Sequence, residues 1–104
     1  MYDVKLTFFY DDAPINKNMP VTSHMHNCFE LVYFISANGT LTINDEEMHI
    51  SSGNIYVIYP GTPHSEIHHT DGRVAFFGFD CPEFPKDILY EGVYKVANHK
   101  KYIT

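Results

Sequence analysis

Four side chains whose types and spacing could bind a transition metal lie in two parts of this sequence: His24, His26 and Glu30 in one, and His64 in the other. If the segment around His24 is a strand, His24 and His26 leave the same face, about 6.7 Å apart along the strand. Two imidazole rings at that spacing can converge on one ion lying about 2 Å from each nitrogen. Three histidines and a carboxylate are a ligand set suited to Fe, Mn, Zn or Ni. The sequence therefore predicts a candidate metal site formed by these four residues.

The same residues also have an interpretation without a metal. A single histidine on a strand is more often an ordinary surface or core residue than a ligand. Glu30 could accept hydrogen bonds from His24 or His26, and a buried pair of this kind satisfies both partners. Without such a partner, desolvation would drive the carboxylate towards its neutral form. The cluster is therefore either a metal site or a polar floor in a ligand pocket.

The elements that position these residues are short strands, because apolar residues recur with a period of two rather than 3.6. The predicted strands are residues 4–8, 20–26, 29–36, 40–44, 47–51, 55–59, 64–69 and 73–80. Turn residues separate them at 11–14, 38–39, 44–45, 60–63 and 71–72, and the pair at 71–72 is predicted to form a hairpin turn. For residues 83–104 we expect only a short turn and an edge strand. This pattern, without an amphipathic helix, predicts an all-β sandwich or barrel.

Composition and charge narrow the functions of this chain. Its 104 residues are enough for one domain, and eight Phe and eight Tyr without Trp suggest an aromatic-rich β core. The formal net charge of −6 would repel a polyanion, so this chain should not bind DNA or RNA by itself. Cys28 and Cys81 are too few for a disulfide framework, which favours reduced thiols in a cytoplasmic protein. There is no signal peptide or long apolar run, so we expect no membrane segment.

With the surrounding sequence, the candidate ligands resemble the two motifs of the cupin family. His24-x-His26-x3-Glu30 resembles the first motif, and Gly53-x5-Tyr59-x-Gly61-x2-His64 resembles the second. The sequence is similar more specifically to the N-terminal domain of AraC-type transcription regulators, over stretches 30–36, 39–41, 53–64 and 77–80. This similarity covers about residues 4–80. It departs from the usual motif residues at Asn18, Ala37, Tyr59 and His68, and none of these departures removes a possible ligand.

The resemblance implies an all-β double-stranded β-helix, the cupin or jelly-roll barrel, which binds a small-molecule effector inside. The effector would contact the region of His24, His26, Glu30 and His64. Tyr33, Tyr56 and Tyr59 could line the same cavity, because each offers a stacking surface and one hydroxyl. His68 shares the face of His64 on the predicted strand.

The resemblance also implies the domain organisation and the partners. We expect residues 1–104 to be a single cupin sensor domain, without the DNA-binding domain of two helix-turn-helix motifs that normally follows. The expected partners are a small-molecule effector and a second copy in a homodimer. DNA would be contacted only through the missing C-terminal domain.

Three functions remain open at this point. The first is the effector-binding and dimerisation domain of an AraC-family regulator, which is not an enzyme and has no catalytic residue. The second is a stand-alone metal-dependent cupin enzyme of the dioxygenase or isomerase type, in which the His and Glu side chains hold the ion. The sequence offers no obvious acid–base pair beyond the ligands, which weakens this second function. The third is a dimerisation module with a vestigial cavity, whose exposed strand edge a partner covers. The first is the function we favour.

Overall fold

The structure is a computed structural model that describes residues 3–87 and 89–95. These residues form nine β-strands and no helix, as the sequence predicts. The strands are β1 (Lys5–Ile15), β2 (Val21–His24), β3 (Phe29–Ser36), β4 (Asn38–Ile43), β5 (Glu46–Ser51), β6 (Ile55–Ile58), β7 (His64–His68), β8 (Gly72–Asp80) and β9 (Gly92–Tyr94). All eight strands predicted with bounds are present, and all but the first agree with the structure to within two residues at each end.

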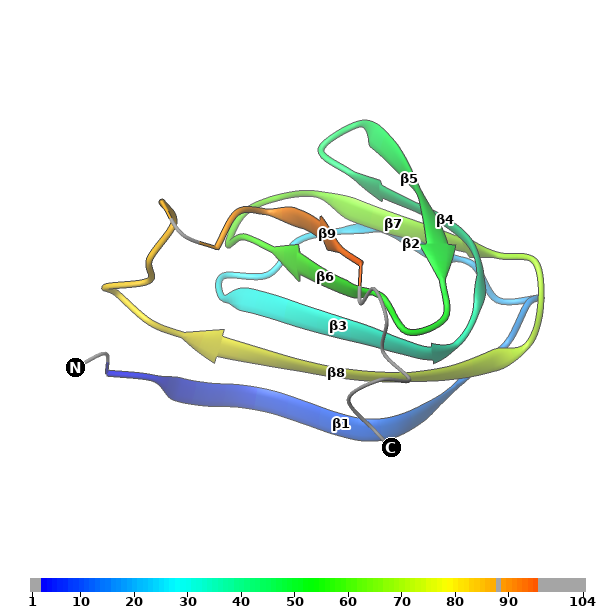
Figure 1. The fold of residues 1–104 in the computed structure, drawn as a ribbon, viewed down its shortest axis with the longest axis horizontal. Coiled ribbons are helices and arrows are strands. Elements are labelled where there is room, and N and C mark those ends of the chain that lie inside the picture. Colours follow the sequence, from blue (N-terminus) through cyan, green and yellow to red (C-terminus); the bar gives the residue numbers. More distant parts are fainter. Residues whose placement is uncertain (1–2, 88, 96–104) are drawn as a thin grey trace.

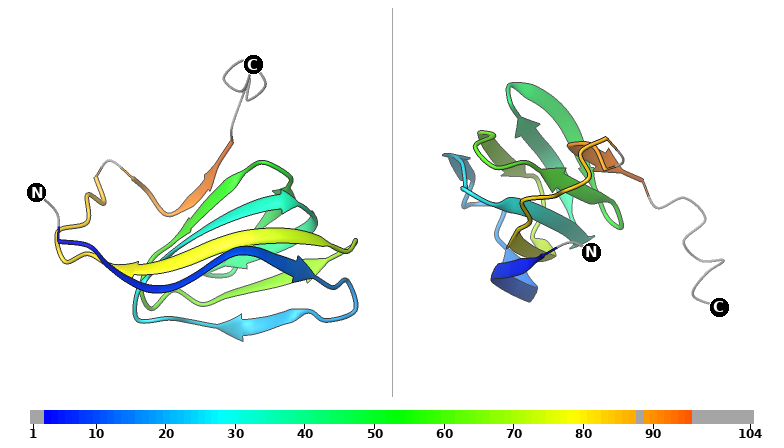
Figure 2. Two further views of the ribbon diagram at one scale, coloured as in Figure 1. Left: turned by 90° about the horizontal axis from the view of Figure 1, so that it is seen from below. Right: turned by 90° about the vertical axis from the view of Figure 1, so that its left-hand side faces the viewer.

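The strands form two antiparallel sheets that share one core. One sheet has the order β1-β8-β3-β6-β9, and the other has the order β2-β7-β4-β5. Figure 1 shows β1, β8, β3 and β6 side by side, and the two further views in Figure 2 show how the sheets curve around each other. Except at β4–β5 and β8–β9, each strand is followed by one in the other sheet. The chain therefore winds around the space between the sheets, where a ligand or a core can be enclosed.

The core between the sheets is built from the inward faces of both. Its buried members are Ile15, Val32, Phe34, Tyr56, Ile58 and Val74 from the first sheet, and Leu41, Ile43 and Ile50 from the second. The period-two pattern of the sequence produces this arrangement, because alternate residues of a strand point to opposite faces. A second cluster of Phe29, Phe79 and Cys81 is covered in part by Phe84.

The first strand differs from the prediction, because it continues through residues 11–14 to Ile15. The pairing of β1 with β8 shifts register between Leu6 and Phe8 and again between Tyr10 and Ala13. The second shift accommodates turn-like residues within a continuous strand. β1 lies at a sheet edge and pairs only with β8, and a proline is tolerated at an edge because one side of the strand needs no hydrogen bonds. The longer strand places more side chains of β1 over the interior than the sequence predicts.

Two predicted turns are also absent. Asn38 and Gly39 lie inside β4, so no turn at 38–39 separates it from β3, and β4 belongs to the other sheet. Likewise, Asp71-Gly72 does not close a hairpin, because β7 and β8 belong to different sheets. Both glycines instead permit close backbone contact: a Cβ atom at Gly39 would clash with the carbonyl of Ile67, and one at Gly72 with the carbonyl of Ser36.

The remaining turn and tail predictions agree with the structure. Asn44 and Asp45 have φ angles of 50° and 68° and close the two-residue hairpin between β4 and β5. β9 pairs with β6 as the predicted edge strand. The part of the tail prediction that concerns residues 88 and 96–104 lies outside the described residues. In the described part of the chain, no helix has the length and hydropathy needed to span a membrane.

Candidate metal centre and ligand cavity

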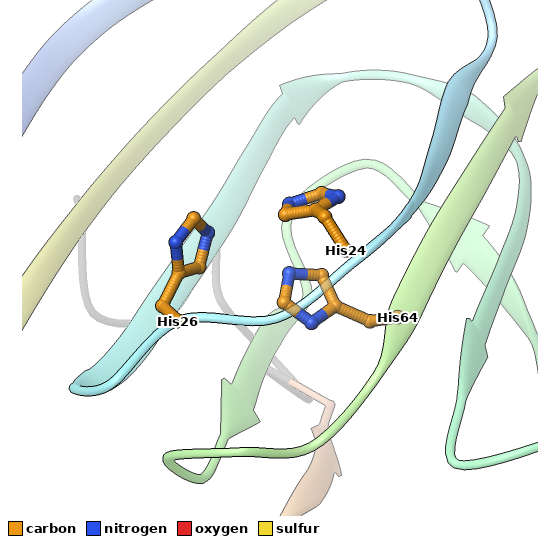
Figure 3. Close-up of side chains that lie close together, drawn as sticks. All are labelled: His24, His26 and His64. Carbon is orange, nitrogen blue, oxygen red and sulfur yellow. The ribbon is translucent and has the colours of Figure 1, made fainter.

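Three histidines from distant parts of the chain converge at one end of the second sheet. His24 ends β2 and stands opposite His64, the first residue of β7, because these two strands pair. His26 lies in the loop after β2, two residues beyond the point where this strand ends. One nitrogen from each of the three rings lies within 4.8 Å of the other two, and Figure 3 shows the rings facing a common point. The three side chains can therefore ligate a single ion.

Backbone carbonyls orient two of these rings. Nδ1 of His24 donates to the carbonyl of Thr22 at 2.8 Å, and Nδ1 of His64 donates to the carbonyl of Thr62 at 3.0 Å. A carbonyl can only accept, so in the neutral rings Nδ1 carries the hydrogen and Nε2 keeps its lone pair. This is the hydrogen-bonding pattern that typically supports a histidine bound to a metal through Nε2.

Glu30 supplies a carboxylate beside this triad. Its Oε1 atom lies 3.2 Å from Nε2 of His64 and 3.7 Å from Nε2 of His26. Glu30 is 7% exposed and His64 is 3% exposed, and while the neutral His64 ring carries its hydrogen on Nδ1, the facing Oε1 and Nε2 atoms are both acceptors without a donor between them. Leaving buried polar atoms without partners costs free energy, and a bound cation would satisfy both atoms. The three histidines therefore fit a divalent metal; the group of ligand atoms within 4.8 Å of one another does not include Glu30, which lies beside two of the histidines.

A cavity of about 730 Å³ opens beside the cluster. Its polar lining residues are Asn16, His24, His26, Glu30, Glu66 and His68, and the others are apolar or aromatic. His64 is not among the lining residues. Small-molecule sites typically have volumes of about 300–1,000 Å³ and a mostly apolar wall with a few polar groups. The cavity thus has the size and chemistry of a small-molecule site.

Comparison with known sequences agrees with these features. Residues 15–85 match the family described as the AraC-like ligand binding domain. The chain belongs to this family. No curated protein matches the chain in sequence.

Solved structures confirm the fold of this AraC-like domain. A conserved protein of unknown function from Streptococcus pyogenes is 15% identical with a TM-score of 0.61, covering 77% of this chain and 75% of that one. An RmlC-like cupin from Shewanella frigidimarina is 13% identical with a TM-score of 0.59, covering 83% and 79%. A cupin protein from Bacteroides fragilis is 16% identical with a TM-score of 0.57, covering 70% and 64%. The predicted double-stranded β-helix is therefore confirmed, and the low identities carry no further conclusion.

The three tyrosines that the sequence places at the cavity lie elsewhere in the AraC-like domain. Tyr56 is fully buried in the core, and its hydroxyl donates to the carbonyl of His49 at 2.7 Å. The Tyr59 hydroxyl donates to the carbonyl of Leu89 at 2.7 Å. Val32 lines the cavity, so its neighbour Tyr33 points to the opposite face of β3. None of the three is a lining residue.

The cavity is also lined by His68, which the sequence places on the face of His64, and by residues that the sequence did not single out. Glu66 and His68 follow His64 at steps of two along β7, so all three side chains leave the same face of that strand. The same alternation would have identified Glu66 from the sequence. Phe8 and Tyr10 of β1 also line the cavity, and the expected end of this strand at residue 8 obscured the role of Tyr10.

The protonation of the histidines responds to their surroundings. Burial lowers the pKa of His26; the Glu30 charge opposes this shift, and the charges of His24 and His64 reinforce it. For His64, burial acts to lower the pKa, but Glu30 and the Thr62 carbonyl outweigh it and raise the pKa above its ordinary value of 6.5. His26 is therefore neutral and available to a metal at pH 7, whereas His64 holds a proton up to a higher pH.

Metal affinity should consequently depend on pH. Because a metal displaces the ligand protons, the affinity for Zn²⁺ is expected to be greatest near pH 8 and to fall as His64 takes up a proton. The loss should begin above pH 6.5, since the pKa of His64 is raised, and approach about tenfold per pH unit for each protonated ligand. Competition titrations with a chromogenic chelator between pH 5.5 and 8 measure this dependence.

Glu30→Gln provides the matched comparison. This variant keeps the size of the side chain and removes the charge that raises the pKa of His64. The pH at which affinity begins to fall should therefore move downward. An affinity that does not change between pH 5.5 and 8 would contradict ligation by these histidines.

Proposed function

We propose that this chain is the effector-binding and dimerisation domain of an AraC-type transcription regulator, without catalytic activity of its own. The observation that carries the proposal is the cavity of about 730 Å³ in a chain that belongs to the AraC-like ligand binding domain family. A regulator of this kind acts in the cytoplasm and reaches DNA through another domain. The net charge of −6 agrees with leaving DNA contact to that domain.

The effector would act through the strands that enclose the cavity. β1 contributes Phe8 and Tyr10 to the lining, and it is also an edge strand with large exposed apolar residues such as Leu6 and Phe9. Exposed strand edges of this kind are commonly covered by a partner, so β1 is our proposed dimer contact. An effector shifts the packing of this strand only as far as it binds one arrangement better than another.

A metal at the histidine cluster belongs to the same proposal. His24, His26 and His64 would hold Zn, Ni, Fe or Mn, with Glu30 as a fourth ligand. The bound ion would act as a Lewis acid at the cavity wall and give an effector a coordination point. The carbonyls of Thr22 and Thr62 keep two of the rings in the orientation that ligation needs. Without a metal, the same side chains would present hydrogen-bonding groups to the effector.

The decisive experiment measures DNA affinity in the full-length regulator. Small metabolites that raise the melting temperature of this chain are first found by thermal shift. Each is then added to the full-length regulator with labelled operator DNA, and fluorescence anisotropy is expected to show a change in affinity of about 5- to 150-fold. His26→Ala should reduce the response and leave the fold intact, because His26 is only partly buried.

Two outcomes would contradict the proposal. If no metabolite that binds the domain changes DNA affinity, the domain is not a sensor. If His26→Ala and Glu30→Ala leave regulation fully intact, the cavity is vestigial and the domain serves dimerisation only.

A metal-dependent enzyme is the second candidate, favoured by one observation. Three histidines and a carboxylate meet beside a cavity, which leaves room for a substrate next to a bound ion. Metal analysis of protein purified without an affinity tag, followed by turnover assays with added Fe(II) or Mn(II), separates this candidate from the sensor. Protein that stays metal-free and inactive under these conditions excludes the enzyme.

A further inference from the structure

The charged side chains that line the cavity are all acidic apart from its histidines. Glu30 and Glu66 are lining residues, and no Lys or Arg is found among the described residues of the wall. Charges interact more strongly in a partly enclosed apolar site than in water. An anionic ligand would face two carboxylates without a fixed counter-charge, whereas a cation would find two partners. The wall therefore favours a positively charged ligand in the metal-free domain.

Glu66 is the carboxylate that lies apart from the metal cluster. It follows His64 by two residues on β7, which places it about 6.8 Å further along the strand. Its Oε1 atom lies 2.7 Å from Nε2 of His68, and the two side chains are 17% and 3% exposed. This hydrogen bond holds the carboxylate in place and leaves its second oxygen for a ligand. Metal ligation uses neither residue, so this pair is free to serve another partner.

His68 adds a second observation at the same end of the cavity. Its Nδ1 atom is buried and has no hydrogen-bond partner, although the residue lines the cavity. Buried polar atoms without partners are uncommon in native proteins and call for a physical explanation. A ligand that reaches the Glu66–His68 pair could supply the missing partner. The Glu66–His68 pair is therefore better explained as part of a ligand-binding site than as part of the packed core.

An aromatic wall faces this acidic lining. Tyr10 and Phe76 stack with ring centroids 4.9 Å apart and planes at 26°, and Phe8 meets Phe76 edge-on at 6.0 Å. All three rings line the cavity and come from β1 and β8. Aromatic faces bind both apolar groups and organic cations, the latter through the negative face of the ring. Aromatic rings and carboxylates in one cavity are a combination suited to amines.

We propose that the cavity selects small organic amines, in which an aromatic or apolar body packs on Phe8, Tyr10 and Phe76 and an ammonium group pairs with Glu66. This inference rests on the proposed small-molecule-binding function and names the class of ligand. The ammonium donates to the free oxygen of Glu66, while His68 keeps the carboxylate oriented. Selection against carboxylates follows from the same two acidic side chains.

Three probes of similar size test the proposal on metal-free protein in EDTA: 2-phenylethylamine, 2-phenylethanol and 3-phenylpropionate. Calorimetry at pH 7 is expected to show the amine binding at least about tenfold more tightly than the carboxylate, a difference of about 1.4 kcal/mol. Glu66→Gln should reduce the affinity for the amine by about tenfold and the affinity for the alcohol by less than about threefold, because only the amine loses an ion pair. The glutamine can still accept from His68, so the fold is retained, and circular dichroism checks this.

Glu47→Gln is the matched control, because Glu47 is exposed on β5 and does not line the cavity. It removes the same charge and should leave all three affinities unchanged. Three results would overturn the proposed selectivity for amines. The carboxylate could bind as tightly as the amine, the two substitutions could weaken amine binding equally, or no probe could bind at all. If the carboxylate binds more tightly than the amine, the proposed selectivity is wrong, but the proposed small-molecule-binding function is still supported. An amine that binds without changing DNA affinity would contradict the sensor function and not the selectivity.

Discussion

His64→Ala is expected to weaken Zn²⁺ binding by at least about 100-fold, since two of the three nitrogen ligands cannot replace the complete set. His64 contributes more than a nitrogen to the site. Its ring is 3% exposed, its Nδ1 donates to Thr62, and its Nε2 lies 3.2 Å from Glu30. The substitution therefore removes the ligand whose orientation is best defined. Competition with a chromogenic chelator at pH 8 measures the loss.

A control and a second variant make this result specific. His49→Ala removes an exposed histidine of β5 and should leave the affinity unchanged. Since His64 is buried, His26→Ala is measured beside it: His26 is half-buried and lies in a loop, so its loss affects ligation with less effect on folding. Zn²⁺ binding that is unchanged in both ligand variants would show that the metal is bound elsewhere.

Metal removal gives an independent measure of the same site. An ion that binds only the folded state stabilises it by about 2.7 kcal/mol when present at 100 times its Kd. EDTA should therefore lower the melting temperature of the unmodified chain loaded with Zn²⁺. It should have little effect on the His64→Ala variant.

Phe34→Ala is expected to reduce the free energy of unfolding by about 3–5 kcal/mol, the cost of removing a large aromatic side chain from a packed core. Phe34 is 0% exposed and lies at the centre of the core between the sheets. Its ring meets Tyr56 at 5.2 Å and His68 at 6.0 Å, so it supports both the core and one wall of the cavity. Urea unfolding followed by circular dichroism measures the change.

The neighbouring residue is the natural control. Ile35 is next along β3, points to the other face and is 39% exposed. Ile35→Ala should therefore cost less than about 1 kcal/mol. Similar losses for the two variants would mean that Phe34 does not lie on the inward face of β3.

Much of this fold follows from local patterns in the sequence. The period of two predicts nearly every strand, because alternating apolar residues fit a sheet with one buried face. Asn44-Asp45 predicts the β4–β5 hairpin, because both residues tolerate the left-handed conformation found there. The types of the candidate ligands at 24, 26, 30 and 64 are also visible in the sequence, and with them the chemistry of a metal site.

Only the tertiary structure decided which strands pair and which faces point inward. Alternation distinguishes the two faces of a strand but does not say which face is buried, so it cannot show that Tyr33 points away from the cavity. At 38–39 and 71–72 the chain crosses between sheets, which depends on distant partners and not on the local turn residues. The pairing of β2 with β7 sets His24 opposite His64. Contacts between residues so far apart in the chain are decided by the packing of the whole domain, and no short segment of sequence encodes them alone.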